Sequence, residues 1–313
     1  MLAARATGNL PGRVGAGPVF HPAIATRREK RFMVFRPLRL EDRAWITACR
    51  DVNEHPFTAL SFASLYSWRV NYGFTVTGDR DFFVIHSEHD GAYYCPCGSA
   101  EKCRAFIDAL EGPAKLLYLT DTQARALEGR GWSVRHRADL SEYILSTAAQ
   151  ALRAGHVSKS FRDKCHHFKN RLAYSTHPIG RADLPFLRTS LRELRDNARE
   201  GAFDDFDVLS ALIENYDALA LRGLLLKCGQ TDFAYILGYE NTPDSFTVSI
   251  GKHSPGLPPE TPVVMIHELA LMLDGEYPLL NLEEDLGLEG LRRAKELQSP
   301  VAHLEVYEAV HAE

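Results

Sequence analysis

The sequence lacks a long apolar run. Its best stretch, residues 262–273, is shorter than the ~18 residues that a membrane-spanning helix needs, and it contains His267 and Glu268. We therefore expect no transmembrane segment and interpret 262–273 as a buried helix. Residues 1–32 lack the apolar core of a secretory signal and hold one acidic residue, Glu29. We expect a disordered tail or a mis-assigned start upstream of Met33, in a cytoplasmic protein.

The sequence also lacks an excess of positive charge and a cysteine framework. With 36 Lys and Arg against 41 Asp and Glu, the net charge is −5, so any contact with nucleic acid must be a local patch. The six cysteines fit neither a disulfide framework nor a zinc pattern, and they indicate reduced thiols. Leu271 stands where the second histidine of a metalloprotease HExxH motif would be. We predict no metal site.

What the sequence does contain is a regular alternation of helices and strands. Its 313 residues favour two domains, and an apolar content of 45% is sufficient for two cores. The fold class is α/β (α+β), with a mixed, mostly antiparallel sheet and flanking helices in each domain. We place the domains at 33–147 and 148–313, with strand 142–146 ending the first and strand 303–310 ending the second.

The second domain runs through a β-meander, a loop, a helix, a strand, a helix and a strand. This order resembles that of a GNAT-type acyltransferase, which implies two tandem GNAT-like domains. In that fold the strand before the loop separates from its neighbour, and the phosphates of the acyl donor meet the following helix N-terminus. The corresponding segments are strand 245–252, loop 254–260 and helix 262–273. The acyl-CoA signatures RxxGxG and QxxGxA are absent, and Gly256 alone would allow a phosphate close to the backbone.

A sharper resemblance lies in residues 281–295, NLEEDLGLEGLRRAK, followed by Ser299-Pro300. These residues resemble a signature of the C-terminal domain of phosphatidylglycerol lysyltransferases and of its soluble, mostly uncharacterised relatives. The resemblance extends over roughly 34–310. It implies a tandem GNAT fold. It also implies an enzyme that transfers an aminoacyl group from aminoacyl-tRNA to a lipid head group. This sequence departs from those enzymes in lacking a transmembrane region, and it has Gly251-Lys252-His253 where many relatives carry an acidic-basic pair.

The acids of the signature are the catalytic candidates. Glu283, Glu284 and Asp285 stand between an expected strand and an expected helix, where a carboxylate could accept the proton of an attacking amine. The alternative is helix capping, which the dipole favours for acids at a helix N-terminus. Asp285 is well placed for capping, whereas three acids in a row exceed what a cap needs.

Two groups of basic residues are candidates for binding phosphate. Arg292 and Lys295 are three residues apart on the expected helix 288–297 and therefore share a face, although they could equally form a solvated face with Glu289. The expected helix 158–172 has a buried stripe of Phe161, Cys165, Phe168 and Leu172. Its outward residues then include Lys159, Arg162, Lys164 and Lys169, which could contact the phosphates of an RNA.

Three functions remain open. The first is an aminoacyltransferase that uses aminoacyl-tRNA, bound through the basic helix, and an amine or hydroxyl acceptor on a small molecule or a lipid head group. The second uses acyl-CoA as the donor substrate instead. The third is a non-catalytic binding protein that retains the fold. No further cofactor is predicted, and the sequence does not indicate the oligomeric state.

Overall fold

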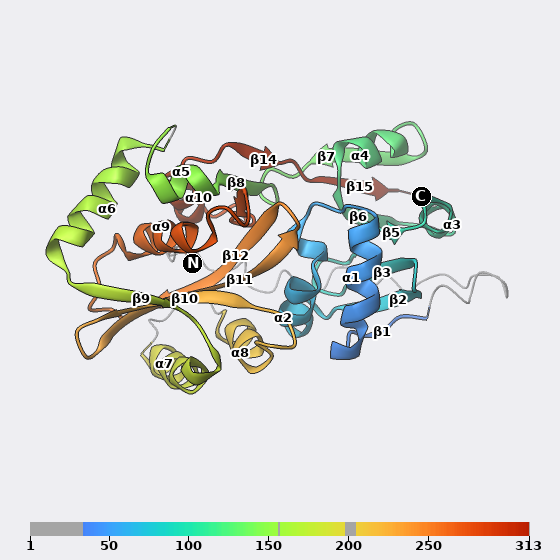
Figure 1. Cartoon of the computed structure of the whole chain (residues 1–313). Coiled ribbons are helices and arrows are strands. Elements are labelled where there is room, and N and C mark those ends of the chain that lie inside the picture. Colours follow the sequence, from blue (N-terminus) through green and yellow to red (C-terminus); the bar gives the residue numbers. More distant parts are fainter. Residues whose placement is uncertain (1–33, 156, 198–204, 313) are drawn as a thin grey trace. The chain divides into compact units, whose positions relative to one another are not determined.

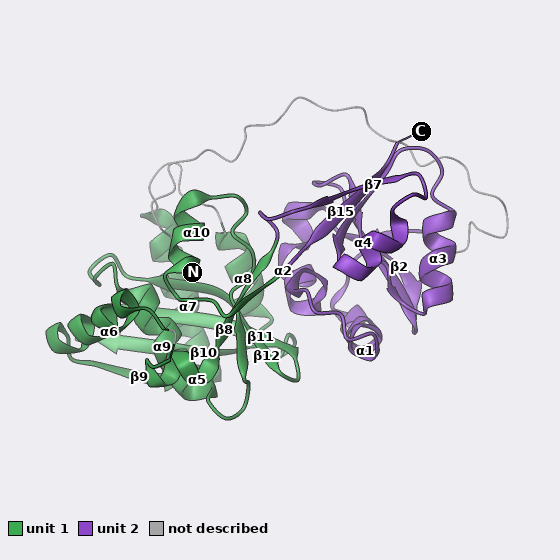
Figure 2. Ribbon diagram, turned by 90° about the horizontal axis from the view of Figure 1, so that it is seen from above, with its two compact units in different colours: residues 1–8, 141–304 green, residues 9–140, 305–313 purple. Residues whose placement is uncertain are grey.

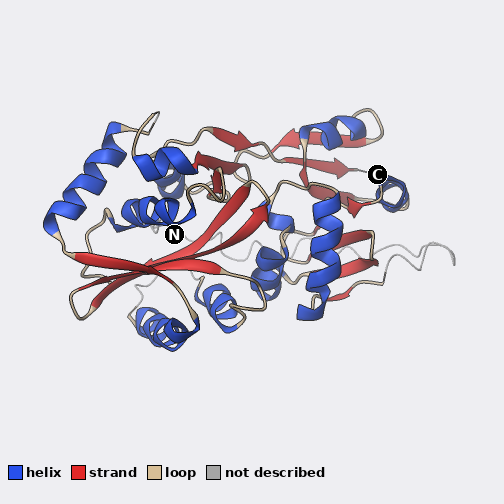
Figure 3. Ribbon diagram, viewed as in Figure 1, coloured by secondary structure: helices blue, strands red, loops and turns tan. Residues whose placement is uncertain are grey.

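The computed structural model describes residues 34–155, 157–197 and 205–312. The expected tail at 1–32 lies outside these residues. The described chain forms two compact units, residues 141–304 (unit 1) and residues 34–140 with 305–312 (unit 2), which Figure 2 colours separately. Each unit is a mixed α/β layer structure in which helices flank one sheet (Figure 3). The expected fold class is confirmed.

Unit 2 has strand order β1-β2-β3-β4-β6-β15-β7, with β5 paired to β3. The parallel pair in this sheet is β4 with β6, joined through helix α3. Its elements are β1 (Arg36–Pro37), α1 (Arg43–Val52), α2 (Phe62–Tyr72), β2 (Thr75–Asp79), β3 (Phe82–Ser87), β4 (Ala92–Tyr94), β5 (Cys97–Gly98), α3 (Ala100–Asp108), β6 (Ala114–Leu119), α4 (Asp121–Leu127), β7 (Trp132–His136) and β15 (Tyr307–His311).

Unit 1 has strand order β14-β8-β13-β12-β11-β10-β9. Its parallel pair is β12 with β13, joined through helix α9. Its elements are β8 (Glu142–Ser146), α5 (Thr147–Leu152), α6 (Lys159–Arg171), β9 (Tyr174–Pro178), α7 (Leu184–Asp196), α8 (Phe206–Glu214), β10 (Arg222–Cys228), β11 (Asp232–Thr242), β12 (Ser245–His253), α9 (Thr261–Leu273), β13 (Leu279–Asn281), α10 (Glu289–Glu296) and β14 (Ala302–Leu304).

The domain expected for strand 142–146 and the extent expected for strand 303–310 differ from the structure. Strand 142–146 was expected to end the first domain, but as β8 it pairs with β13 and β14 in unit 1. The single expected strand 303–310 is two strands. Its first part, β14, stays in unit 1, and its second part, β15, inserts between β6 and β7 of unit 2. Alternating apolar residues predict a strand but contain no information about a distant partner.

The core of unit 1 lies between its sheet and helices α5, α6 and α9, and helices α7 and α8 cover the opposite face of the sheet (Figure 1). Helix α6 shows how the sequence builds this core. Phe161, Cys165 and Phe168 recur at helical spacing and are buried in it, with Leu172 packed against them. Burying each large apolar side chain contributes roughly 1.5–3 kcal/mol. The predicted stripe is therefore confirmed, and it fixes which face of α6 points outward.

None of the described helices is both long enough and apolar enough to cross a lipid bilayer.

Candidate functional site

Strands β12 and β13 separate in unit 1 after a short parallel stretch. They pair only at Ser245 with Leu279, Phe246 with Leu280 and Thr247 with Asn281. Strand β12 continues along β11 as far as His253, with a bulge opposite the step from Leu237 to Gly238. Residues 248–253 therefore have one edge that is not paired with β13. This is the separation that the GNAT resemblance implies, and it leaves this edge of β12 without ladder partners from β13.

The segment that follows β13 turns sharply at the point of separation. Glu283 has φ +60°, in the left-handed region that costs a non-glycine residue free energy. The fully buried Asn281 holds this conformation, because its Oδ1 accepts the Glu283 N–H at 2.8 Å. The Asn281 Nδ2 in turn donates to Glu142 Oε2 at 2.6 Å, from the neighbouring strand β8. A residue held in a strained conformation by buried partners is a candidate functional residue.

The Glu283 side chain is half-buried and has a neutral donor as its partner. Tyr239 of β11 donates its hydroxyl proton to Glu283 Oε1 across 3.3 Å. Burial, followed by repulsion from the Glu284 carboxylate, raises the pKa of Glu283 to about 8. A carboxyl group with a pKa near neutrality can accept a proton at physiological pH and hold it more firmly than an ordinary glutamate. These properties suit a general base.

Asp285 has the opposite character. Its side chain is fully buried, and it accepts hydrogen bonds from Tyr143 Oη at 2.6 Å, Arg292 Nε at 2.8 Å, Arg292 Nη2 at 3.3 Å and the Gly287 N–H at 2.8 Å. Burial opposes ionisation, but the bonds from Arg292 and Tyr143 hold the pKa of Asp285 below its usual value. Four bonds use the acceptor capacity of a carboxylate. Asp285 is therefore suited to organising the signature segment rather than to accepting a proton.

Lys295 and Arg292 both turn toward the signature segment. The Lys295 ammonium is buried and donates to the carbonyl oxygen of Leu282 at 2.5 Å and to that of Glu284. Burial lowers its pKa. The Arg292 side chain remains 48% exposed while it pairs with Asp285. The structure thus brings Glu283, Asp285, Arg292 and Lys295 together, with Lys295 supporting the backbone around Glu283. We call this group, with Asn281 and Glu284, the signature cluster.

The basic residues of α6 lie on its exposed face and at the edges of its buried stripe. Lys159 is 85% exposed and lies 3.9 Å from Asp163, and Lys169 lies 3.2 Å from Glu268. Arg162 donates to the Val157 carbonyl at 2.5 Å, and Lys164 is half-buried. The helix is anchored beside α10, because Ser299 Oγ accepts the N–H of its cap residue Ser158 at 2.9 Å. The basic residues of α6 therefore lie on a helix whose start is held next to the end of α10.

The loop between β12 and α9 does not offer an open phosphate cradle. A Cβ added at Gly256 would stand 2.3 Å from Asp232 Oδ1, so a carboxylate fills that side of the glycine. Ser254 Oγ donates a hydrogen bond to this carboxylate at 2.8 Å and accepts one from the Phe233 N–H at 3.1 Å. Glu260 adds a second acid immediately before α9. The Asp232 carboxylate would repel a pyrophosphate, so this geometry disfavours the role that the loop position predicted for Gly256.

Sequence reasoning missed the residues that other strands contribute. Tyr143 and Glu142 come from β8, and Tyr239 comes from β11. All three occupy ordinary strand positions, and no local motif marks them. Among the described residues, no three His, Cys, Asp or Glu side chains are grouped as a metal ion would require, and the described cysteines are free thiols.

The two α/β units, each with one sheet and one parallel strand pair joined through a helix, have the fold expected of tandem GNAT-like domains. The chain belongs to the family described as phosphatidylglycerol lysyltransferase, C-terminal, whose model matches residues 53–310. None of the curated proteins matches this sequence.

Solved structures agree on the fold. A conserved protein of unknown function from Bacteroides thetaiotaomicron has a TM-score of 0.77 at 24% identity, covering 89% of this chain and 99% of that one. The C-terminal domain of a putative lysylphosphatidylglycerol synthetase from Agrobacterium fabrum has a TM-score of 0.59 at 15% identity, with 87% and 92% covered. L-PGS from Bacillus licheniformis has a TM-score of 0.55 at 14% identity, with 75% and 83% covered. At these identities the likeness concerns the fold alone.

Proposed function

We propose that this chain is an aminoacyltransferase that takes an aminoacyl group from aminoacyl-tRNA and passes it to an amine or hydroxyl acceptor. The observation that carries the proposal is the signature cluster at the separation of β12 and β13, where the pKa of Glu283 is raised to about 8. The family name supports an aminoacyl group as the group transferred. The acceptor is a small molecule or a lipid head group.

The reaction requires no covalent enzyme intermediate. The acceptor nitrogen or oxygen attacks the ester carbonyl of the aminoacyl-tRNA while Glu283 takes its proton. A new amide or ester bond forms, the bond to the ribose oxygen of the tRNA breaks, and the proton passes to that oxygen. Backbone N–H groups on the unpaired edge of residues 248–253 stabilise the developing negative charge on the carbonyl oxygen. Most of the acceleration then comes from positioning and from these donors.

Asp285, Arg292 and Lys295 act on Glu283 through the backbone in this mechanism. Asp285 and Arg292 hold the turn that follows β13, and Lys295 binds the carbonyl oxygens on either side of Glu283, at Leu282 and Glu284. Catalytic groups need a supporting shell that fixes their orientation, because a misplacement of about 1 Å can cost roughly 100-fold in rate. Glu284 contributes by repelling a negative charge on Glu283.

The donor assignment rests on two charge patterns. The negative charges of Asp232 and Glu260, at the loop before α9, disfavour binding of the pyrophosphate of coenzyme A. Helix α6 instead presents Lys159, Arg162, Lys164 and Lys169 outward in a protein of net charge −5. A local basic surface is sufficient for contact with an RNA backbone. An acyl-CoA donor is the alternative that these acids disfavour.

The test is a full panel of tRNAs, each charged with its amino acid, incubated with purified protein and with a mixture of amine and hydroxyl acceptors. Loss of the aminoacyl ester is followed by acid gel, with uncharged tRNA and a no-protein reaction as controls. We expect one or a few charged tRNAs to lose their ester faster than the control. The proposal fails if no member of the panel is bound or consumed. Binding of charged tRNA without turnover would identify a non-catalytic binding protein.

A further inference from the structure

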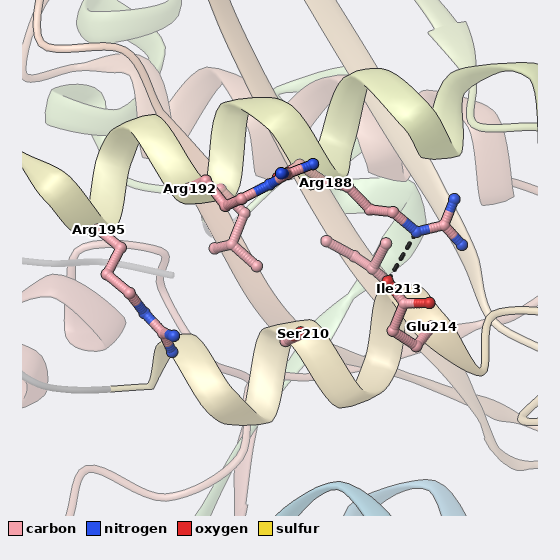
Figure 4. A pocket seen from close by; sticks show the side chains of 7 residues that line it. Arg188, Arg192, Arg195, Ser210, Ile213 and Glu214 are labelled. Atoms are coloured by element: carbon pink, nitrogen blue, oxygen red, sulfur yellow. Dashed lines mark hydrogen bonds and ion pairs between the residues drawn. The ribbon is translucent and has the colours of Figure 1, made fainter.

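Helices α7 and α8 border a pocket that the proposed reaction does not use. The pocket has a volume of about 180 Å³ and is lined by Arg188, Leu191, Arg192, Arg195, Ser210, Ile213 and Glu214 (Figure 4). It lies in the helical layer on the face of the unit 1 sheet opposite α6 and α9 (Figure 1). The signature cluster and the loop before α9 contribute no residue to its lining.

The arginines of the pocket share one face of α7, because positions 188, 192 and 195 are separated by about one and two helical turns. Two of them are held by acids of α8. Arg188 Nε lies 2.7 Å from Glu214 Oε1, and Arg195 pairs with Asp207. These ion pairs fix the outer guanidinium groups at the two ends of the pocket. Part of the side-chain entropy that ligand binding would cost is therefore already lost.

Arg192 stands between the two ion-paired arginines and differs from them. Its Nε reaches only the carbonyl oxygen of Arg188, at 3.4 Å, and no carboxylate pairs with it in the part of the chain that the structure describes. Three arginines against Asp207 and Glu214 leave one positive charge at the pocket. A planar guanidinium with unused N–H donors matches the oxygens of a phosphate.

The floor of the pocket is apolar. Leu191 and Ile213, which line it, are 6% and 1% exposed, and Ser210 adds a hydroxyl group. The volume is smaller than the roughly 300–1,000 Å³ of pockets for drug-sized ligands. A ligand for this site is therefore compact, with an anionic end toward Arg192 and a small apolar part against Leu191.

We propose that the pocket between α7 and α8 binds the phosphate group of a small phosphomonoester or phosphodiester, with Arg192 as its principal ligand. Arg188 and Arg195 flank the phosphate, and Ser210 donates a hydrogen bond from the opposite helix. The same chemistry is offered by free inorganic phosphate and by a glycerophosphate head group, so the two sources are compared directly. This site does not depend on the proposed aminoacyl transfer.

The experiment titrates the full chain with inorganic phosphate, with glycerol 3-phosphate and with a short-chain, water-soluble phosphatidylglycerol, using calorimetry at low ionic strength. It compares the wild type with Arg192→Gln. The matched control is Arg104→Gln, which removes an exposed helical arginine of unit 2. A charge-assisted hydrogen bond is worth about 1.5–3 kcal/mol, so Arg192→Gln should weaken binding by roughly tenfold or more, whereas Arg104→Gln should not change it.

Each outcome of this titration either supports or overturns the proposed phosphate site. Tighter binding of a glycerophosphate than of inorganic phosphate, lost in Arg192→Gln, supports a head-group site that uses the apolar floor. Equal binding of both, lost in the same variant, supports a phosphate site. No saturable binding of any of the three at millimolar concentration overturns the proposal, and so does binding that Arg192→Gln leaves unchanged. Thermal melts of both variants show whether each one is folded.

Discussion

The two units place different chemistry at the same topological position. Each sheet contains one parallel strand pair joined through a helix, β12 with β13 in unit 1 and β4 with β6 in unit 2. In unit 1 the strands separate beside Asn281, Glu283 and Asp285. In unit 2 the parallel pairing covers Tyr93 with Leu116 and Tyr94 with Leu117, and it is closed by the Cys95 N–H, which donates to the Leu117 carbonyl at 2.8 Å.

The surroundings of the two strand pairs also differ. Around β4 and β6 the buried residues include Cys95, Leu116 and Leu119, which form part of an apolar core. Around β12 and β13 the buried residues include Asn281, Asp285 and Lys295. Burying polar groups is costly unless they are hydrogen-bonded, and Asn281, Asp285 and Lys295 each have hydrogen-bond partners. The two sheets therefore share an arrangement of strands, and we propose that the chemistry belongs to unit 1.

The largest expected effect is that of Glu283→Gln on the rate of aminoacyl transfer. Replacing Glu283 with Gln keeps the shape of the side chain and removes the base, and general-base catalysis typically contributes about 100- to 10,000-fold. We expect the rate of aminoacyl transfer to fall within that range. The exposed Glu193 of α7 provides the control, since Glu193→Gln should leave the rate unchanged. If Glu283→Gln retained the wild-type rate, the base would have to be another group.

The second prediction concerns pH. The pKa of Glu283 is raised to about 8, chiefly by burial, so its carboxylate form increases tenfold per pH unit below that value. The transfer rate, corrected for spontaneous ester hydrolysis, should rise roughly 50-fold from pH 6 to pH 8 and at most about twofold more above pH 8. For stability the sign is opposite. The raised pKa favours the protonated folded state, so this group's contribution decreases as pH rises from about 4.5 to 8. Glu283→Gln should flatten both profiles.

The third prediction concerns stability. Asp285→Asn removes a buried negative charge that Arg292 and Tyr143 contact, and hydrogen bonds to charged groups are worth about 1.5–3 kcal/mol. We expect the free energy of unfolding to fall by about 2–3 kcal/mol at pH 7. In unit 2, Asp139 pairs with Arg137 nearer the surface, so Asp139→Asn should cost less than about 1 kcal/mol. Equal costs for the two variants would remove the distinction between the units.

The acid dependence of the same variant follows from the lowered pKa of Asp285. The stabilisation by its carboxylate is complete above the unfolded pKa of about 3.9 and is lost as pH falls through the folded value. The difference in unfolding free energy between the wild type and Asp285→Asn should therefore be constant near neutrality and shrink below about pH 4. Denaturant titrations at several pH values measure it.

The fourth prediction concerns RNA. The double variant Lys159→Glu, Arg162→Glu reverses two charges on the exposed face of α6, and each lost phosphate contact lowers the salt slope of binding by about 1. We expect the affinity for tRNA to fall by roughly tenfold at physiological salt. Arg104→Glu in unit 2 is the control. Unchanged tRNA affinity in the double variant would leave α6 as a solvated face.

The smallest expected effect is that of acyl-CoA esters on the melting temperature. A ligand at 100 times its dissociation constant stabilises a protein by about 2.7 kcal/mol, which thermal melts detect readily. Because Asp232 and Glu260 stand at the loop before α9, millimolar acyl-CoA esters should leave the melting temperature unchanged. A clear increase would restore coenzyme A as the donor.

Local patterns predicted much of this structure, and non-local contacts account for the rest. The stripe of Phe161, Cys165 and Phe168 fixed the outward face of α6 in advance, because helical periodicity is a local property. The membership of β8 and β15 in their sheets was not predictable, since strand pairing depends on distant partners. The same limit applies to the candidate site. Glu283 was visible in the signature, but its partner Tyr239 and the carboxylate beside Gly256 come from β11.

The central claim is that the chemistry belongs to the strand separation of unit 1 and not to the corresponding position of unit 2. Single-turnover transfer from a charged tRNA at pH 8 tests it most directly, with Glu283→Gln compared against Tyr118→Phe at the end of β6. We predict that Glu283→Gln loses at least about 100-fold in rate, while Tyr118→Phe stays close to the wild type. Equal losses in the two variants, or a loss confined to Tyr118→Phe, would contradict the claim.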